Sequence, residues 1–155
     1  MDAETLSHDS LRPTTDDAVA ERLGIELWRF QHALRATLDS ALDGSDLSVS
    51  EYCVLELVRS QPGITASSLA DQVFITRQAL GRTIARLHDA RLLLAAPSGR
   101  GAARPLRTTP EGDSRLEDVQ ELILRAHGRL FSPLSQTERS QLIDMISRCS
   151  HAHAS

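Results

Sequence analysis

The sequence predicts a mainly α-helical fold that carries one small β-hairpin. Apolar residues recur every three or four positions through most of the 155 residues, which is the period of an amphipathic helix. Between residues 92 and 108 this period is lost, and two short apolar runs flank a glycine-containing loop. Short apolar runs around such a loop are typical of a hairpin with a flexible tip.

The first helix is expected to be unusually long. Residues 1–15 are polar and predict a flexible arm, and from Asp16 a helix of about 27 residues follows, more than twice the average length. A helix of this length usually packs against an extended surface, often a second copy of itself. Its apolar stripe is Val19, Leu23, Leu27, Phe30, Leu34, Leu38 and Leu42.

Helix start signals divide the rest of the chain. Ser48 with Glu51 and Ser135 with Glu138 are capping-box pairs, which open helices with reciprocal side-chain-to-backbone bonds. Three threonines are expected to cap further helices, and the third precedes a proline and an acid. The expected helices begin at Ser48, Thr65 (over 66–73), Thr76 (over 76–90), Thr109 and Ser135; the strands are Leu92–Ala95 and Leu106–Thr108, with a further short pairing at Ile64.

Two short helices, 66–73 and 76–90, joined by a tight turn and followed by a hairpin, describe a winged helix-turn-helix. In such a unit the second helix enters the DNA major groove. We therefore expect a DNA-binding domain over 47–112, placed between helical regions at 16–46 and 113–150.

The charge distribution supports a polyanionic partner. The net charge is −4, and all seventeen basic residues are arginine. Residues 75–107 nevertheless hold seven arginines and one acid, Asp89. A basic block in an otherwise acidic chain is typical of nucleic-acid binding. The 3% aromatic content argues against stacking platforms for single strands.

Most of the residues expected to contact DNA lie on the helix at 76–90. Leu80, Ile84 and Leu87 should face the core, which leaves an outer face with glutamine and arginine, the residue types that pair with adenine, guanine or phosphate. Base reading is expected from Gln78 and Arg82, and phosphate binding from Arg86. The candidate DNA-binding residues are Thr76, Arg77, Gln78, Gly81, Arg82, Arg86, Arg100 and Arg104.

Three of these positions have alternative interpretations. Gly81 would let the backbone approach the groove floor, or it would permit close packing between helices. Arg100 and Arg104 would enter a minor groove from the hairpin tip, or they would belong to a solubilising loop.

The segment Leu47–Gly112 resembles the MarR (multiple-antibiotic-resistance regulator) family of bacterial transcription factors. "LSVSEYCVLELV" is similar to that family's second helix, "TASSLADQVFITRQALGRTIARL" to its helix-turn-helix, "RTTPEG" to the end of its wing and "LSQTERSQLIDMI" to its last helix. The resemblance implies a homodimeric regulator, most simply a repressor, that reads a palindromic duplex. It also implies that the helical regions 16–46 and 113–150 form the dimerisation region. The rival hypothesis is a winged protein-interaction module that does not bind DNA.

The resemblance also marks departures. Gly81 stands where the family usually has a small hydroxyl residue, and Arg91 replaces a glycine before the first wing strand. The wing's usual Asp-x-Arg positions are Arg100 and Ala102, so the wing arginine is either Arg100 or Arg104.

Many relatives release DNA when a phenolic or anionic molecule binds near the dimer helices. Trp28, His32 and Tyr52 would line such an effector cavity, or they would simply pack. Some relatives sense oxidants through a cysteine near the start of the first helix, where this chain has none, and we expect Cys53 and Cys149 to be buried thiols.

No enzyme motif of the GxSxG, HExxH, P-loop or GxGxxG type is present. We expect no enzyme activity and no cofactor. The cluster Cys149, His151 and His153 has residue types that bind zinc, but it lies near the chain end, and no metal is expected. No run reaches the roughly 18 apolar residues of a membrane helix, and no signal peptide is evident, which predicts a cytoplasmic protein.

Overall fold

The computed structural model describes residues 15–73, 75–96 and 104–153, in two compact parts. One part comprises the residues up to Ala36 and the other begins at Thr37. The first helix, α1 (Thr15–Ala41), crosses this boundary. Each part is described by itself.

In the first part, the apolar stripe of α1 is exposed. Val19, Leu23 and Leu27 are between 47% and 61% exposed, and Trp28 is 73% exposed. The long helix itself is confirmed, and its 27 residues begin one residue before the expected start. Most of the stability of a helix in a protein comes from the packing of its apolar face, so a surface that covers this stripe would stabilise α1.

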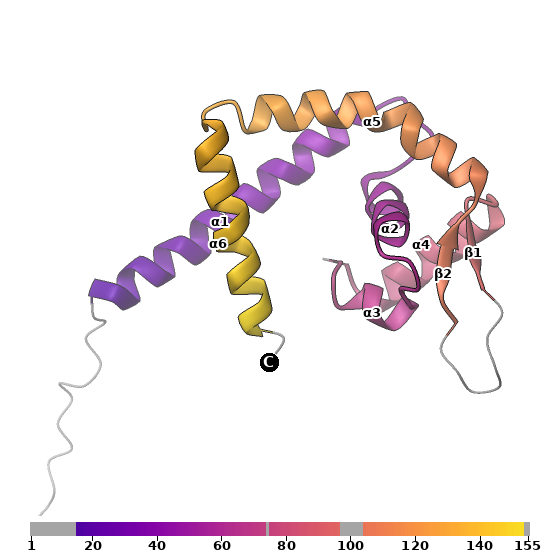
Figure 1. Cartoon of the computed structure of the whole chain (residues 1–155), viewed down its shortest axis with the longest axis horizontal. Coiled ribbons are helices and arrows are strands. Elements are labelled where there is room, and N and C mark those ends of the chain that lie inside the picture. The colour runs from indigo at the N-terminus through magenta and orange to yellow at the C-terminus, as the bar shows by residue number, and fades with distance from the viewer. Residues whose placement is uncertain (1–14, 74, 97–103, 154–155) are drawn as a thin grey trace, which may run out of the picture. The chain divides into compact units, whose positions relative to one another are not determined.

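The second part is the winged helix-turn-helix with two further helices, as predicted (Figure 1). Its centre is α2, which packs against α3, α4, α5 and β2. Fully buried side chains include Val54, Leu55, Leu69, Leu87, Leu93 and Leu116. The elements are α2 (Val49–Ser60), α3 (Ala66–Ala70), α4 (Arg77–Asp89), β1 (Leu93–Ala95), β2 (Leu106–Thr108), α5 (Pro110–Leu130) and α6 (Gln136–His153).

The predicted caps are confirmed. Ser48, Thr65, Thr76 and Thr109 each accept a hydrogen bond from the backbone N–H three residues further on. The Ser135–Glu138 pair forms the second capping box. These bonds satisfy amides that have no partner within the helix, which is why short local motifs located the helix starts.

The third helix is shorter than the range 66–73. It ends at Ala70, because the amide of Gln72 turns back to the carbonyl of Leu69, three residues earlier (3.0 Å). A bond to the third preceding residue tightens the chain into a turn, as at many helix ends.

The hairpin is antiparallel, with Leu94 opposite Arg107. Its first strand begins at Leu93 rather than Leu92, because Leu92 closes α4 instead. The expected extra pairing is present: the amide of Leu106 donates to the carbonyl of Ile64 (2.8 Å), next to a bridge between Thr65 and Pro105. The wing is therefore tied to the start of α3.

Arg91 ends α4 in the left-handed conformation, with φ at 59°. Its amide bonds the carbonyl of His88 (2.9 Å), and the amide of Leu92 bonds the carbonyl of Leu87 (2.9 Å). This is the Schellman motif, which usually has glycine at the left-handed position. Arg91 thus keeps the backbone conformation of the glycine that it replaces.

We expect Arg91→Gly to raise the free energy of unfolding by about 0.5–1 kcal/mol. A side chain in this conformation costs roughly 1–2 kcal/mol, which is partly offset because glycine loses more freedom on folding. Chemical denaturation of both proteins measures the difference. A destabilised glycine variant would show that the arginine side chain makes a compensating contact.

Gly112, in the first turn of α5, is required by a close approach that the sequence does not reveal. A Cβ at this position would lie 2.2 Å from the carbonyl oxygen of Leu92. The same carbonyl accepts a hydrogen bond from Thr109 (3.1 Å), and the Thr109 hydroxyl donates to the carbonyl of Arg91 (2.7 Å). The start of α5 is therefore pressed against the start of the wing.

We expect Gly112→Ala to destabilise the protein by about 1–3 kcal/mol, since the backbone must shift to admit the methyl group. Gly128 is the matched control, because it lies in the same helix with open space at its Cβ. Gly128→Ala should be neutral or should stabilise by up to about 1 kcal/mol. Equal effects in thermal unfolding would contradict the close approach.

Candidate nucleic-acid interface

The two faces of α4 differ as the sequence predicts. Leu80 and Leu87 are buried and Ile84 is half-buried. Thr83, which the sequence pattern did not single out, completes this inner face, and its hydroxyl donates to the carbonyl of Ala79 (3.1 Å). That bond lets a polar side chain sit in the core without an unpaired donor.

The outer face of α4 carries the predicted residues, and all of them are exposed. Thr76 caps the helix, and Arg77 pairs with Asp71 after α3 (3.2 Å). Gln78 and Arg82 follow on the same exposed face, and Arg82 has no ion-pair partner among the described residues. Donors for base edges or phosphate are thus available near the helix start.

Gly81 lies in open space on this face. Outside its own stretch of helix, a Cβ there would meet no heavy atom of the described residues within 4 Å. Packing between the described helices therefore does not require Gly81. The helix accepts a residue that costs about 1 kcal/mol relative to alanine, and its own packing does not require it.

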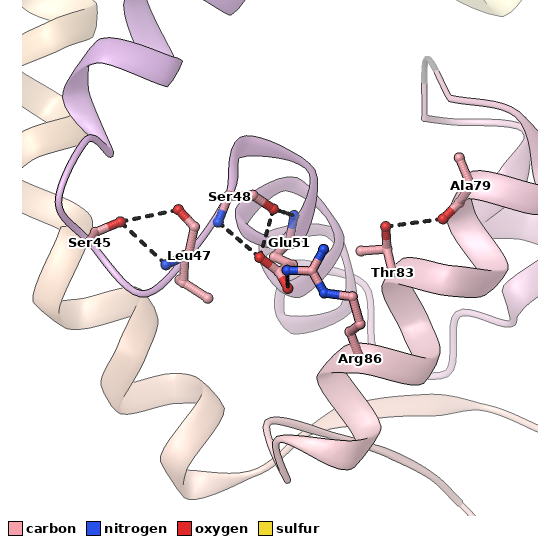
Figure 2. A network of polar contacts seen from close by, with 7 residues as sticks. All are labelled: Ser45, Leu47, Ser48, Glu51, Ala79, Thr83 and Arg86. Carbon is pink, nitrogen blue, oxygen red and sulfur yellow. Dashed lines mark hydrogen bonds and ion pairs between the residues drawn. The ribbon is translucent and has the colours of Figure 1, made fainter.

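Arg86 is held by the start of α2 (Figure 2). One of its terminal nitrogens lies 2.9 Å from Oε1 of Glu51, whose side chain is only 9% exposed. Oε2 of Glu51 accepts from the amide and the hydroxyl of Ser48, at 2.9 Å and 2.6 Å. The sequence identified Glu51 as a capping residue, but its pair with Arg86 depends on how α2 packs against α4.

Of the wing, the structure describes the two strands and the residues next to them, up to Ala96 and from Arg104. Arg104 is exposed, and its guanidinium reaches back to the carbonyls of Ala95 and Ala96, both at 3.4 Å. Arg107, which the sequence analysis did not select, is exposed on β2 and adds a further positive charge. Arg100 lies outside the described residues.

The three expected effector residues are divided between the two parts of the chain. Trp28 and His32 are exposed on α1 in the first part, and Tyr52 is half-buried on α2 in the second. Burial, reinforced by the Glu56 carboxylate, raises the pKa of the Tyr52 hydroxyl, so it stays protonated near neutral pH. The cavity remains a sequence-based prediction.

A hollow of about 290 Å³ lies in the second part, between the α1–α2 turn and α5. Its charged lining is mostly acidic, and its arginine, Arg115, is already paired with Asp46 and with Glu111. None of the three expected effector residues lines it. An acidic wall of this kind does not favour an anionic ligand.

The cysteine prediction is wrong for Cys149, which is exposed, whereas Cys53 is half-buried. Cys149 follows the exposed apolar residues Ile143, Met145 and Ile146 on α6, a helix that leaves much of its apolar surface uncovered. No cluster of three metal-ligating side chains occurs within the described part of the chain, and the side chains of His151 and His153 lie outside it. None of the described helices has the length and hydropathy to cross a membrane.

A capped two-helix unit, an exposed arginine-bearing second helix and an attached two-stranded wing define a winged helix-turn-helix protein. Residues 45–102 match a sequence model of the MarR family. This segment contains the helix-turn-helix and the first strand of the wing, so this part of the chain carries a MarR-type domain.

Two comparisons extend beyond the matched segment. The HTH-type transcriptional repressor Rv2887 of Mycobacterium tuberculosis is 24% identical over 127 residues, which cover 81% of this chain and 91% of that protein. A MarR-family regulator from Rhodococcus sp. RHA1 has a similar fold, with a TM-score of 0.74 and 21% identity, over 85% of this chain and 96% of the other.

Two solved complexes with DNA share the fold. Rv2887 with DNA superposes with a TM-score of 0.62 at 22% identity, over 82% of this chain and 96% of the other. A mutant of MarR from E. coli with operator DNA gives a TM-score of 0.70 at 19% identity, over 88% and 98%. Rv2887 has also been solved with salicylic acid and with p-aminosalicylic acid.

Proposed function

We propose that this protein is a homodimeric, cytoplasmic repressor that binds a palindromic DNA operator through α4 and the wing. The observation that carries the proposal is the outer face of α4, where Gln78 and Arg82 are exposed beside the gap at Gly81. Arginine and glutamine at the start of a recognition helix are suited to guanine and adenine edges. The complex of Rv2887 with DNA and the complex of a mutant E. coli MarR with operator DNA support the same use of the fold.

The proposed dimer rests on uncovered apolar surface. The first part of the α1 stripe, from Val19 to Leu27, is exposed. The helices α5 and α6 also expose Leu124 and Ile143, at 60% and 66%. Surface of this kind on long helices is typical of an interface. A second copy of the chain would cover it and would place two winged lobes about one helical turn apart on a palindrome.

We also propose that a small aromatic or anionic effector releases the protein from DNA. The similar protein Rv2887, which has been solved with salicylic acid and with p-aminosalicylic acid, supports this proposal. Trp28, His32 and Tyr52 are the residues proposed to line the effector site. The acidic hollow beside Arg115 is not the proposed site, because its charge disfavours such ligands.

Selection of bound duplexes from random DNA tests the function, and Arg82→Ala tests the site. The selected sequences should be palindromic, and affinity should fall steeply with salt because phosphate contacts release counterions. Arg82→Ala should cost about 1–3 kcal/mol and relax the preference at one base position. Titrations of both proteins with the selected duplex provide the measurement.

The outcomes separate the hypotheses. A stable dimer that binds no duplex at low salt would favour the protein-interaction module instead. If DNA binding is retained in full by Arg82→Ala, Arg82 does not read a base.

Gly81→Leu should abolish operator binding while the dimer stays folded. The new side chain would fill the gap on the face proposed to meet the groove floor, and its Cβ would meet no heavy atom of the other described elements within 4 Å. Leucine should even stabilise the helix by about 0.8–1 kcal/mol relative to glycine. Sedimentation and thermal unfolding check the dimer, and operator titration checks binding, with Gly81→Ala as the intermediate step. Unimpaired binding by the leucine variant would remove Gly81 from the interface.

A further inference from the structure

Glu51 combines two roles that usually belong to separate residues. Its side chain is 9% exposed, and both carboxylate oxygens are engaged. Oε2 closes the capping box at the start of α2, and Oε1 meets Arg86 of α4. A buried carboxylate is costly unless it is paired and hydrogen-bonded, so each partner restrains the position of this group.

The second capping box shows that the ion pair is not inherent to the motif. Glu138 accepts from the amide and the hydroxyl of Ser135 at 2.8 Å and 2.7 Å, nearly the same geometry. Glu138 is exposed, and no arginine pairs with it among the described residues. The pair at Glu51 therefore arises from the packing of α2 on α4.

Arg86 is held from one side only. Its side chain is 69% exposed although one terminal nitrogen contacts Glu51. A guanidinium has five N–H donors in a rigid planar arrangement, so donors remain for a second anion. Because the capping box holds Glu51, its contact with Oε1 restrains the position of the Arg86 guanidinium before any ligand arrives (Figure 2).

We propose that Glu51 is a positioning residue for DNA binding, which holds the Arg86 guanidinium ready to meet a phosphate. This inference rests on the proposed function, since it requires that α4 binds DNA. A side chain that is already restrained loses less conformational freedom when it binds, and restraint of a planar guanidinium also sets its direction of approach.

Glu51→Gln separates the two roles of Glu51. The glutamine oxygen still accepts from Ser48 and preserves the cap, but its NH₂ group donates and cannot accept from Arg86. The experiment titrates the full-length protein with its selected duplex over a range of salt concentrations. It compares wild type, Glu51→Gln, Arg86→Ala and the double variant, with Glu138→Gln as the control for loss of a capping carboxylate.

We expect Glu51→Gln to weaken binding about threefold to tenfold. The salt dependence should be unchanged, because Arg86 keeps its charge. Arg86→Ala should lower the salt slope by about one phosphate contact. In the Arg86→Ala background, Glu51→Gln should cause no further loss, and Glu138→Gln should bind as wild type does.

Other results overturn the inference. Tighter binding with a steeper salt dependence in Glu51→Gln would show that Glu51 withholds Arg86 from DNA. Unchanged binding in Glu51→Gln would show that the ion pair has no role in recognition. An equal loss with or without Arg86 would show a general structural defect.

A second variant tests the proposal if Glu51→Gln proves unable to fold. If Glu51→Gln does not fold, Arg86→Lys should show the same loss of affinity at unchanged salt slope, since lysine keeps the charge but lacks the planar fork. Full affinity in that variant contradicts the proposal. A wild-type protein that binds no duplex overturns the proposed function itself, which is a distinct outcome.

Discussion

The packing of α2 into the centre of the second part is the constraint on which the rest of the structure depends. Val54 and Leu55 are completely buried, and the helix contacts α3, α4, α5 and β2. Because all of these elements pack on α2, the orientation of α4 and the position of the wing depend on this one burial. Hydrophobic burial of this kind is the main favourable contribution to folding.

The polar contacts at the edges of this core set how the helices and the wing are oriented. Apolar packing alone does not specify these orientations. Glu51 links the start of α2 to Arg86, and the carbonyl of Ile64 ties the wing to the turn before α3. At the far end of α4, Arg91 and Leu92 complete the Schellman motif that turns the chain into β1. Together these contacts hold the exposed face of α4 and the base of the wing in one structural unit.

Features that depend on residues close together in the chain could be predicted from the sequence, and features that depend on distant residues could not. Start signals such as Ser48 with Glu51, or Thr109 with Pro110, were readable because capping bonds span only three residues. The end of α3 was misplaced because no local residue type marks the turn around Leu69. Gly112 was missed as a packing residue because its requirement arises from the carbonyl of Leu92, twenty positions away in the chain.

The sequence by itself determined the six helices, the hairpin, the inner and outer faces of α4 and the concentration of arginine around that helix. These follow from periodicity, capping chemistry and charge, which are local properties of the chain. Only the tertiary structure decided that Gly81 faces open space, that Gly112 touches backbone and that Arg86 meets a buried carboxylate. Such contacts join segments far apart in the chain, and their geometry is set by how the helices pack around α2.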